Sequence, residues 1–174
     1  MCIRDRVVDA EEMVNKIRAA AAARQDPDFL IIARTDARTN HGVEEAIRRA
    51  RLYEQAGADI IFVESLESVE EMRMVNEAIA KPTIANMVEG GRTPYLTAQE
   101  LQDLGYRLVV FPVSTLYAAM QSVLDVLGEL KATGTVDLSA GKMVNFTQFN
   151  DLIGLPLVRE LEENRFDSVA KKLR

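Results

Sequence analysis

Cysteine, histidine and tryptophan are scarce or missing in this chain of 174 residues. It has one cysteine, Cys2, one histidine, His41, and no tryptophan. A lone cysteine excludes an internal disulfide framework and is typical of a reducing compartment, so we expect a cytoplasmic protein. A lone histidine excludes a catalytic histidine pair and a two-histidine metal site within the chain.

Long apolar runs and an excess of positive charge are also missing. No stretch approaches the roughly 20 apolar residues that a membrane helix needs, and no apolar segment is followed by a small-residue cleavage site. The formal net charge is -6, which argues against nucleic acid or an anionic membrane as the main partner. With 48% hydrophobic and 28% charged residues, the chain has the composition of a globular domain.

What the chain does contain is an alternation of apolar runs and amphipathic stretches. We expect strands at residues 29–33, 59–63, 82–86 and 107–114, and helices at 7–25, 43–56, 68–80 and 97–105. A long last helix should turn five apolar residues inward: Leu116, Met120, Val123, Leu127 and Leu130. The strands begin about 25 to 30 residues apart, the size of a βα unit. Each is continuously apolar, which is typical of a parallel sheet covered on both faces, as in a doubly wound sheet or a (β/α)8 barrel.

Two of the expected helices begin with the pattern of a capping box. Ser68 precedes Glu71 by three residues, and Thr97 precedes Glu100 by the same spacing. In such a box the hydroxyl and the carboxylate each accept a hydrogen bond from the other residue's backbone N–H. We therefore expect both helices to begin at these residues.

A polar side chain stands at the end of every expected strand. Arg34, Glu64, Asn86 and Ser114 occupy these four places. In both parallel architectures ligands bind at the carboxyl ends of the strands. An arginine fork, an amide and a carboxylate gathered there would form a pocket for a small oxygen-rich anion.

Each of these residues also has an ordinary structural explanation. Arg34 could simply pair with Asp36 or a helix end, Glu64 could be a solvated loop acid, and Asn86 could be a turn residue. The functional interpretation depends on the coincidence of four strands that carry a polar side chain at the same end.

Three motifs, in order, resemble the isocitrate lyase/phosphoenolpyruvate mutase superfamily. They are IIARTDA, EAIRRARLYEQAGADIIFVES and KPTIANMVEGGRTP. The resemblance implies a (β/α)8 barrel, a tetramer in which the last helix is exchanged between neighbouring subunits, and Mg2+ as cofactor. It also implies a small anionic dicarboxylate or 2-oxo acid as substrate, converted through a pyruvate-type enolate.

The resemblance assigns substrate-binding roles to particular residues. Arg34 matches the arginine that holds the substrate carboxylate and enolate oxygen, Glu64 a substrate-contacting residue, and Asn86 an asparagine that binds a carboxylate. Val88 stands where methylisocitrate lyases carry threonine, which favours a dimethylmalate lyase-like or carboxyphosphonate mutase-like member. Ser114 completes the expected set, and no metal ligand is expected in this chain.

The motifs correspond to the second half of the family barrel. We expect residues 7–132 to form its strands 5–8 with their helices, residues 133–174 to form a helical tail that packs on the barrel or a neighbouring subunit, and residues 1–6 to be a foreign start. The aspartates that hold Mg2+ and the acid/base loop of the family have no counterpart in the sequence, so this chain alone should be an inactive part of a carbon–carbon lyase. Phosphonate P–C chemistry, oxaloacetate decarboxylation and a non-catalytic binding module remain as alternatives.

Overall fold

The computed structural model of the protein describes residues 6–137, 141 and 143–172, with side chains as far as residue 165. Within it the chain divides into two compact units, residues 1–116 and 117–174. They are described separately below.

The first unit alternates helices with parallel strands. Its elements are α1 (Ala10–Ala23), β1 (Ile32–Thr35), α2 (Ala37–Gln55), β2 (Ile60–Val63), α3 (Val69–Ala78), β3 (Ile84–Asn86), α4 (Ala98–Asp103) and β4 (Leu108–Val110). β1 pairs with β2 and β3 pairs with β4, both in parallel. A single parallel bridge between Ile61 and Thr83 joins the two pairs. The α/β class and the parallel strands agree with the sequence prediction.

Helix starts follow the capping signals in part. At α4 both hydrogen bonds of the predicted capping box between Thr97 and Glu100 are present. At α3 the Ser68 hydroxyl accepts from the Glu71 backbone N–H, but the Glu71 carboxylate accepts from the backbone N–H of Glu67. The second predicted box is therefore only half formed, because the Glu71 side chain is also held by an arginine described below.

The region around β1 differs most from the prediction. The strand begins at Ile32 rather than residue 29, and both Phe29 and Leu30 are exposed. α2 begins at Ala37 rather than residue 43, and it contains a break at Gly42, whose φ is 85°. A left-handed φ is readily adopted only by glycine, so Gly42 joins two helical segments where the sequence pattern showed one.

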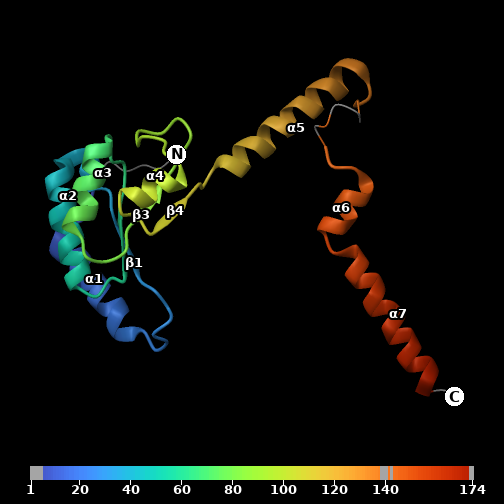
Figure 1. Cartoon of the computed structure of the whole chain (residues 1–174), viewed down its shortest axis with the longest axis horizontal. Coiled ribbons are helices and arrows are strands. Elements are labelled where there is room, and N and C mark those ends of the chain that lie inside the picture. Colours follow the sequence, from blue (N-terminus) through green and yellow to red (C-terminus); the bar gives the residue numbers. More distant parts are fainter. Residues whose placement is uncertain (1–5, 138–140, 142, 173–174) are drawn as a thin grey trace. The chain divides into compact units, whose positions relative to one another are not determined.

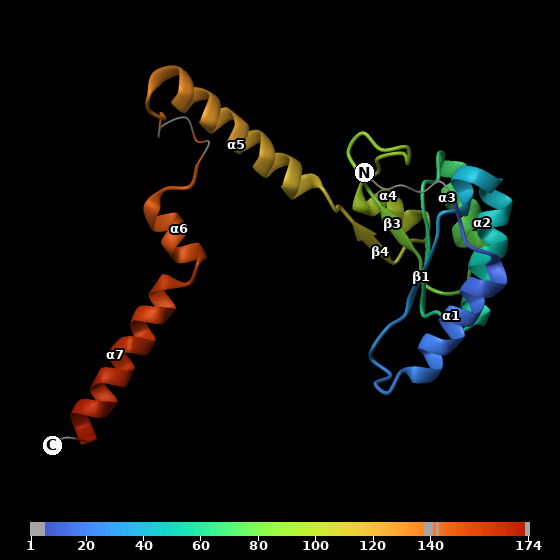
Figure 2. The ribbon, with the colours of Figure 1, turned by 180° about the vertical axis from the view of Figure 1, so that it is seen from behind.

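The helices cover only one face of the strands. α2 packs on β1 and β2, with α1 and α3 beside it, and the two opposite views place α1, α2 and α3 together on one side (Figures 1 and 2). On the other face Ile32, Leu108 and Val110 are exposed. Within the first unit the expectation that every strand is buried on both faces is wrong, because no described element of that unit covers this face.

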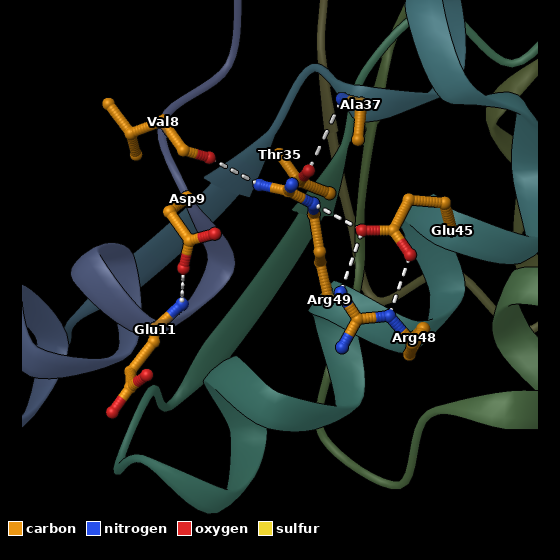
Figure 3. A network of polar contacts seen from close by, with 8 residues as sticks. All are labelled: Val8, Asp9, Glu11, Thr35, Ala37, Glu45, Arg48 and Arg49. Carbon is orange, nitrogen blue, oxygen red and sulfur yellow. Dashed lines mark hydrogen bonds and ion pairs between the residues drawn. The ribbon is translucent and has the colours of Figure 1, made fainter.

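The core on the helical face includes one arginine that sequence patterning misplaces. Arg48, Arg49 and Arg51 fit a solvated helix face, yet Arg49 is buried. It donates to the backbone oxygen of Val8 at 2.7 Å and to Glu45 Oε1 at 2.7 Å (Figure 3). Arg49 thus ties the segment before α1 to α2, and its burial is possible because its charge is paired.

The carboxylate of Glu45 gives this network a measurable pH dependence. Hydrogen bonds from Arg48 and Arg49 lower the pKa of Glu45 from 4.5 to about 2, although partial burial opposes them. A lowered pKa in the folded state adds stability above pH 4.5, which is lost as the pH falls toward 2. Because Arg48 is half exposed, solvent screening reduces this contribution to roughly 1–2 kcal/mol.

Glu45→Gln should therefore destabilise the protein by that amount at pH 7 and make no difference near pH 2. Urea unfolding at a series of pH values measures the gap. Glu44→Gln is the matched control, because Glu44 is exposed and adjacent and its loss should cost almost nothing. A gap that stays constant between pH 7 and 2 would contradict the assignment.

The second unit contains helices with uncovered apolar side chains. They are α5 (Ser114–Thr133), whose first turn lies in the first unit, α6 (Phe146–Leu152) and α7 (Leu155–Lys172). The five residues expected to point inward from the long helix are all exposed in the structure. Within the second unit that prediction is wrong, since no described residue of this unit covers the stripe. None of the described helices is long and apolar enough to cross a membrane.

Candidate anion-binding site

Arg34 lies on the open face of the strands and is held there by acidic neighbours. Side chains alternate along a strand, so Arg34 shares the open face with Ile32 and lies beside Phe62, its partner in the register. Its Nε donates to Asp36 Oδ1 at 2.7 Å, and its Nη2 lies 3.1 Å from Glu64 Oε2. The guanidinium carbon stacks 4.8 Å from the centre of the Phe62 ring. Nη1 takes part in none of these ion pairs, so the fork is fixed in place with one end still available.

Glu64 follows β2 directly and is the most enclosed acid of the site. It is only 8% exposed, and its backbone N–H donates to the Thr35 oxygen at 3.0 Å. The next residue, Ser65, has a φ of 61°, the one positive φ outside glycine among the described residues. Such strain is typical of functional sites. The Ser65 hydroxyl donates to Glu64 Oε1 at 3.4 Å, so the turn and the hydroxyl both help to fix the carboxylate.

Asn86 ends β3 and reaches the same carboxylate. Its Nδ2 donates to Glu64 Oε2 at 3.3 Å. A carboxylate only accepts hydrogen bonds, which fixes the orientation of the amide. Its Oδ1 is buried without a hydrogen-bond partner in the described part of the chain. Arg34, Glu64 and Asn86 therefore meet, as their positions in the sequence predict.

Ser114 and Val88 take other roles. The Ser114 hydroxyl donates to Glu89 Oε1, and the Tyr95 hydroxyl donates to the same oxygen at 3.1 Å. These bonds lower the pKa of Glu89, with Ser114 as the larger cause. Val88 offers no polar side chain, and its backbone oxygen accepts from Gly91 at 2.9 Å. The structure thus records Ser114 in a contact that ties the loop after β3 to the start of α5, a role that the sequence reasoning missed.

A second arginine, Arg38, links the loops at this end of the strands. Its Nε and Nη2 bind the two oxygens of Glu71 at 3.0 and 2.7 Å, and its Nη1 lies 2.5 Å from Glu67. The bond with Glu71 raises the pKa of Arg38 and lowers that of Glu71. Arg92, from the loop after β3, lies 3.8 Å from the same Glu67 carboxylate. No sequence signal pointed to this cluster, because Arg38 reaches Glu71 across 33 residues.

The described residues do not form a metal site by themselves. Among them, no group of three or more His, Cys, Asp or Glu side chains is placed to hold a metal ion. Glu64, the enclosed acid, is already occupied by Arg34 and Asn86. No chemical step through a metal is therefore derived from these residues.

The described unit carries a fixed arginine, an enclosed carboxylate and an amide at the carboxyl ends of parallel strands, which is the edge where parallel α/β folds bind their ligands. The sequence profile described as phosphoenolpyruvate phosphomutase matches residues 3–131. The chain belongs to this family, which lies in the isocitrate lyase/phosphoenolpyruvate mutase superfamily, as the sequence motifs indicated.

Named relatives cover most of this chain. The 2,3-dimethylmalate lyase of Eubacterium barkeri is 50% identical over 158 residues, which are 91% of this chain and 55% of that protein. A structure of oxaloacetate acetylhydrolase with the inhibitor 3,3-difluorooxalacetate superposes with a TM-score of 0.86 at 31% identity, over 94% of this chain and 56% of the other. A structure of phosphonopyruvate hydrolase with oxalate and Mg2+ gives 0.79 at 28% identity, over 93% and 59%. The chain spans about half the length of the curated relatives that it matches.

Proposed function

We propose that this chain supplies the substrate-anion site of a carbon–carbon lyase that acts on a 2-hydroxy or 2-oxo dicarboxylate through a pyruvate-type enolate. The observation that carries the proposal is Arg34, fixed by Asp36 and Glu64 on the open face beside Asn86. The 2,3-dimethylmalate lyase and oxaloacetate acetylhydrolase among the relatives support a dicarboxylate, whereas the phosphonopyruvate hydrolase keeps phosphonate P–C chemistry as the alternative.

The arginine suits the charge that develops during such a reaction. When the carbon–carbon bond breaks, its electron pair moves into the fragment that becomes the 2-oxo acid and appears as negative charge on the enolate oxygen. A guanidinium N–H aimed at that oxygen stabilises the charge more strongly than that of the neutral ketone. Because Arg34 is already held by two carboxylates and the Phe62 ring, it needs little rearrangement to do so.

The net charge around this site supports a cation as cofactor. Three arginines, Arg34, Arg38 and Arg92, face five carboxylates: Asp36, Glu64, Glu67, Glu71 and Glu89. A substrate with two negative charges would be repelled by this excess unless a cation joined it. We propose Mg2+ for that role in the whole enzyme, held by residues outside those described here. Bound Mg2+ would supply charge neutralisation at the enolate.

The open face supports a half-barrel. We propose that residues 7–132 form the C-terminal half of a (β/α)8 barrel. Half a barrel would leave its interior face and the outer edges of its first and last strands uncovered. The exposed apolar face, and the outer edges of β1 and β4, which pair with no other described strand, fit this arrangement. An uncovered strand edge otherwise favours aggregation.

Binding of product-like anions tests the anion site. We expect oxalate and pyruvate to shift the backbone amide NMR signals of Arg34, Glu64 and Asn86, which a titration of 15N-labelled protein measures. Signals around Arg107, at the opposite end of β4, serve as the internal control. Absence of any shift at millimolar ligand would refute the proposed site.

The purified 174-residue chain should not turn over substrate. No acid/base group besides the arginine-bound Glu64 is enclosed at this site among the described residues, and proton transfer typically contributes a factor of about 100 or more. Incubation with Mg2+ and 2,3-dimethylmalate or methylisocitrate, followed by a 2-oxo acid assay, measures this. Turnover by this chain would overturn the proposal that the acid/base group and the metal ligands lie outside the described residues.

A further inference from the structure

Glu67 lies at the meeting point of three loops that follow β1, β2 and β3. It belongs to the loop after β2, and its carboxylate contacts Arg38, from the start of α2, and Arg92, from the loop after β3. These loops extend from the strand ends that carry Arg34, Glu64 and Asn86. One carboxylate between two arginines has the geometry that an anionic ligand group would adopt there.

The two arginines are held very differently. Arg38 is largely buried, and its Nε and Nη2 bind both oxygens of Glu71 besides the contact of Nη1 with Glu67. Arg92 is 62% exposed, and its one recorded ion pair within the described residues is the 3.8 Å contact with Glu67. An exposed pair at that distance contributes little to stability, so Arg92 can exchange Glu67 for another anion at small cost.

Two glycines, Gly90 and Gly91, precede Arg92 in the loop after β3. Gly90 has a φ of 72°, and a Cβ on Gly91 would lie 3.0 Å from the Val88 backbone oxygen. The positive φ favours glycine at position 90, and a side chain at position 91 would crowd the Val88 backbone oxygen. The double glycine therefore turns the loop sharply three residues after the buried Met87 and presents Arg92 at the same end of the strands as the anion site.

We propose that Arg92 is a substrate-binding residue that takes the second carboxylate of a dicarboxylate, and that Glu67 holds that place when no ligand is bound. The inference rests on the proposed function, because it assumes that Arg34 and Asn86 bind the 2-oxo acid end. Arg38 then forms the fixed side of the second subsite and Arg92 the adjustable side. Discrimination between one carboxylate and two is thereby assigned to Arg92.

Two ligands that share one end test this assignment. Pyruvate carries one carboxylate, and 3,3-difluorooxalacetate carries the same 2-oxo acid end with a second carboxylate. Their dissociation constants are measured by NMR titration on the full chain. Arg92→Gln should weaken the binding of 3,3-difluorooxalacetate about 10-fold, which corresponds to the loss of one charge-assisted hydrogen bond. The dissociation constant of pyruvate should not change. Glu67→Gln should strengthen the binding of 3,3-difluorooxalacetate about threefold, because a neutral amide competes less well than the Glu67 carboxylate for Arg92.

Arg107→Gln is the matched control. It removes the same charge from an exposed arginine at the opposite end of β4, so it should leave both dissociation constants unchanged. Equal weakening of both ligands by Arg92→Gln, or equal weakening by Arg107→Gln, would overturn the assignment, since net charge would then explain the effect. Unchanged binding in Arg92→Gln would also overturn it. A wild-type chain that binds neither ligand would instead refute the anion site itself.

Discussion

Arg34→Met should abolish measurable binding of oxalate and pyruvate, and it should lower the free energy of unfolding by about 2–3 kcal/mol. The loss of binding follows because methionine keeps the length of the side chain but removes every donor of the fork. The loss of stability follows because Glu64 is only 8% exposed and would lose its ion pair with Arg34, and breaking an enclosed ion pair from one side is costly. NMR titration and urea unfolding measure the two effects on the same sample.

The double variant Arg34→Met/Glu64→Gln separates the fold from the site. Replacing the Glu64 carboxylate by a neutral amide should restore about half of the lost free energy of unfolding. Binding of oxalate and pyruvate should stay absent. Arg24→Met is the matched control, because Arg24 forms a comparably enclosed ion pair with Asp59 at 2.6 Å near the amino ends of the strands. It should cost a similar free energy of unfolding and leave oxalate binding intact. Binding that survives in Arg34→Met would remove Arg34 from the proposed site.

The strand-end residues could be predicted because parallel strands bring their carboxyl ends to one edge whatever the details of the loops. Arg34, Glu64 and Asn86 each lie at or next to the last residue of a strand, so their meeting needs only the strand order. Asp36 was also foreseen as a partner of Arg34, since two residues' separation lets the side chains meet across the end of the strand.

The loop contacts could not be predicted, because they depend on dihedrals that the sequence does not determine alone. Ser114 pairs with Glu89 across 25 residues, and Arg38 joins Glu71 across 33. Burial failed as a prediction for a different reason. Apolar periodicity shows that Ile32, Val110 and the stripe on α5 need a cover, but it does not show whether the same chain provides it.

Met120→Glu/Leu127→Glu, two changes in the apolar stripe on α5, should abolish self-association of the chain. Leu116, Met120, Val123, Leu127 and Leu130 recur at alternating spacings of four and three residues, all exposed. This pattern forms one continuous apolar seam along a helix. We propose that a second copy of the chain covers it, because an apolar stripe of this length left in water favours association. Sedimentation equilibrium should then show an oligomer for the wild type and at least 100-fold weaker association for the variant, since each buried carboxylate costs several kcal/mol.

Ala118→Glu/Ser122→Glu supplies the matched control, because it adds the same two charges to the same helix on the side away from the seam. Helix propensity and net charge change alike in both variants, so circular dichroism should show equal helix content. If only the seam variant dissociates, the position of the two charges is the cause, and the seam is the contact surface. If the control dissociates as readily as the seam variant, charge repulsion rather than the apolar face governs assembly. A wild-type chain that stays monomeric would contradict the proposal that a second copy covers the seam.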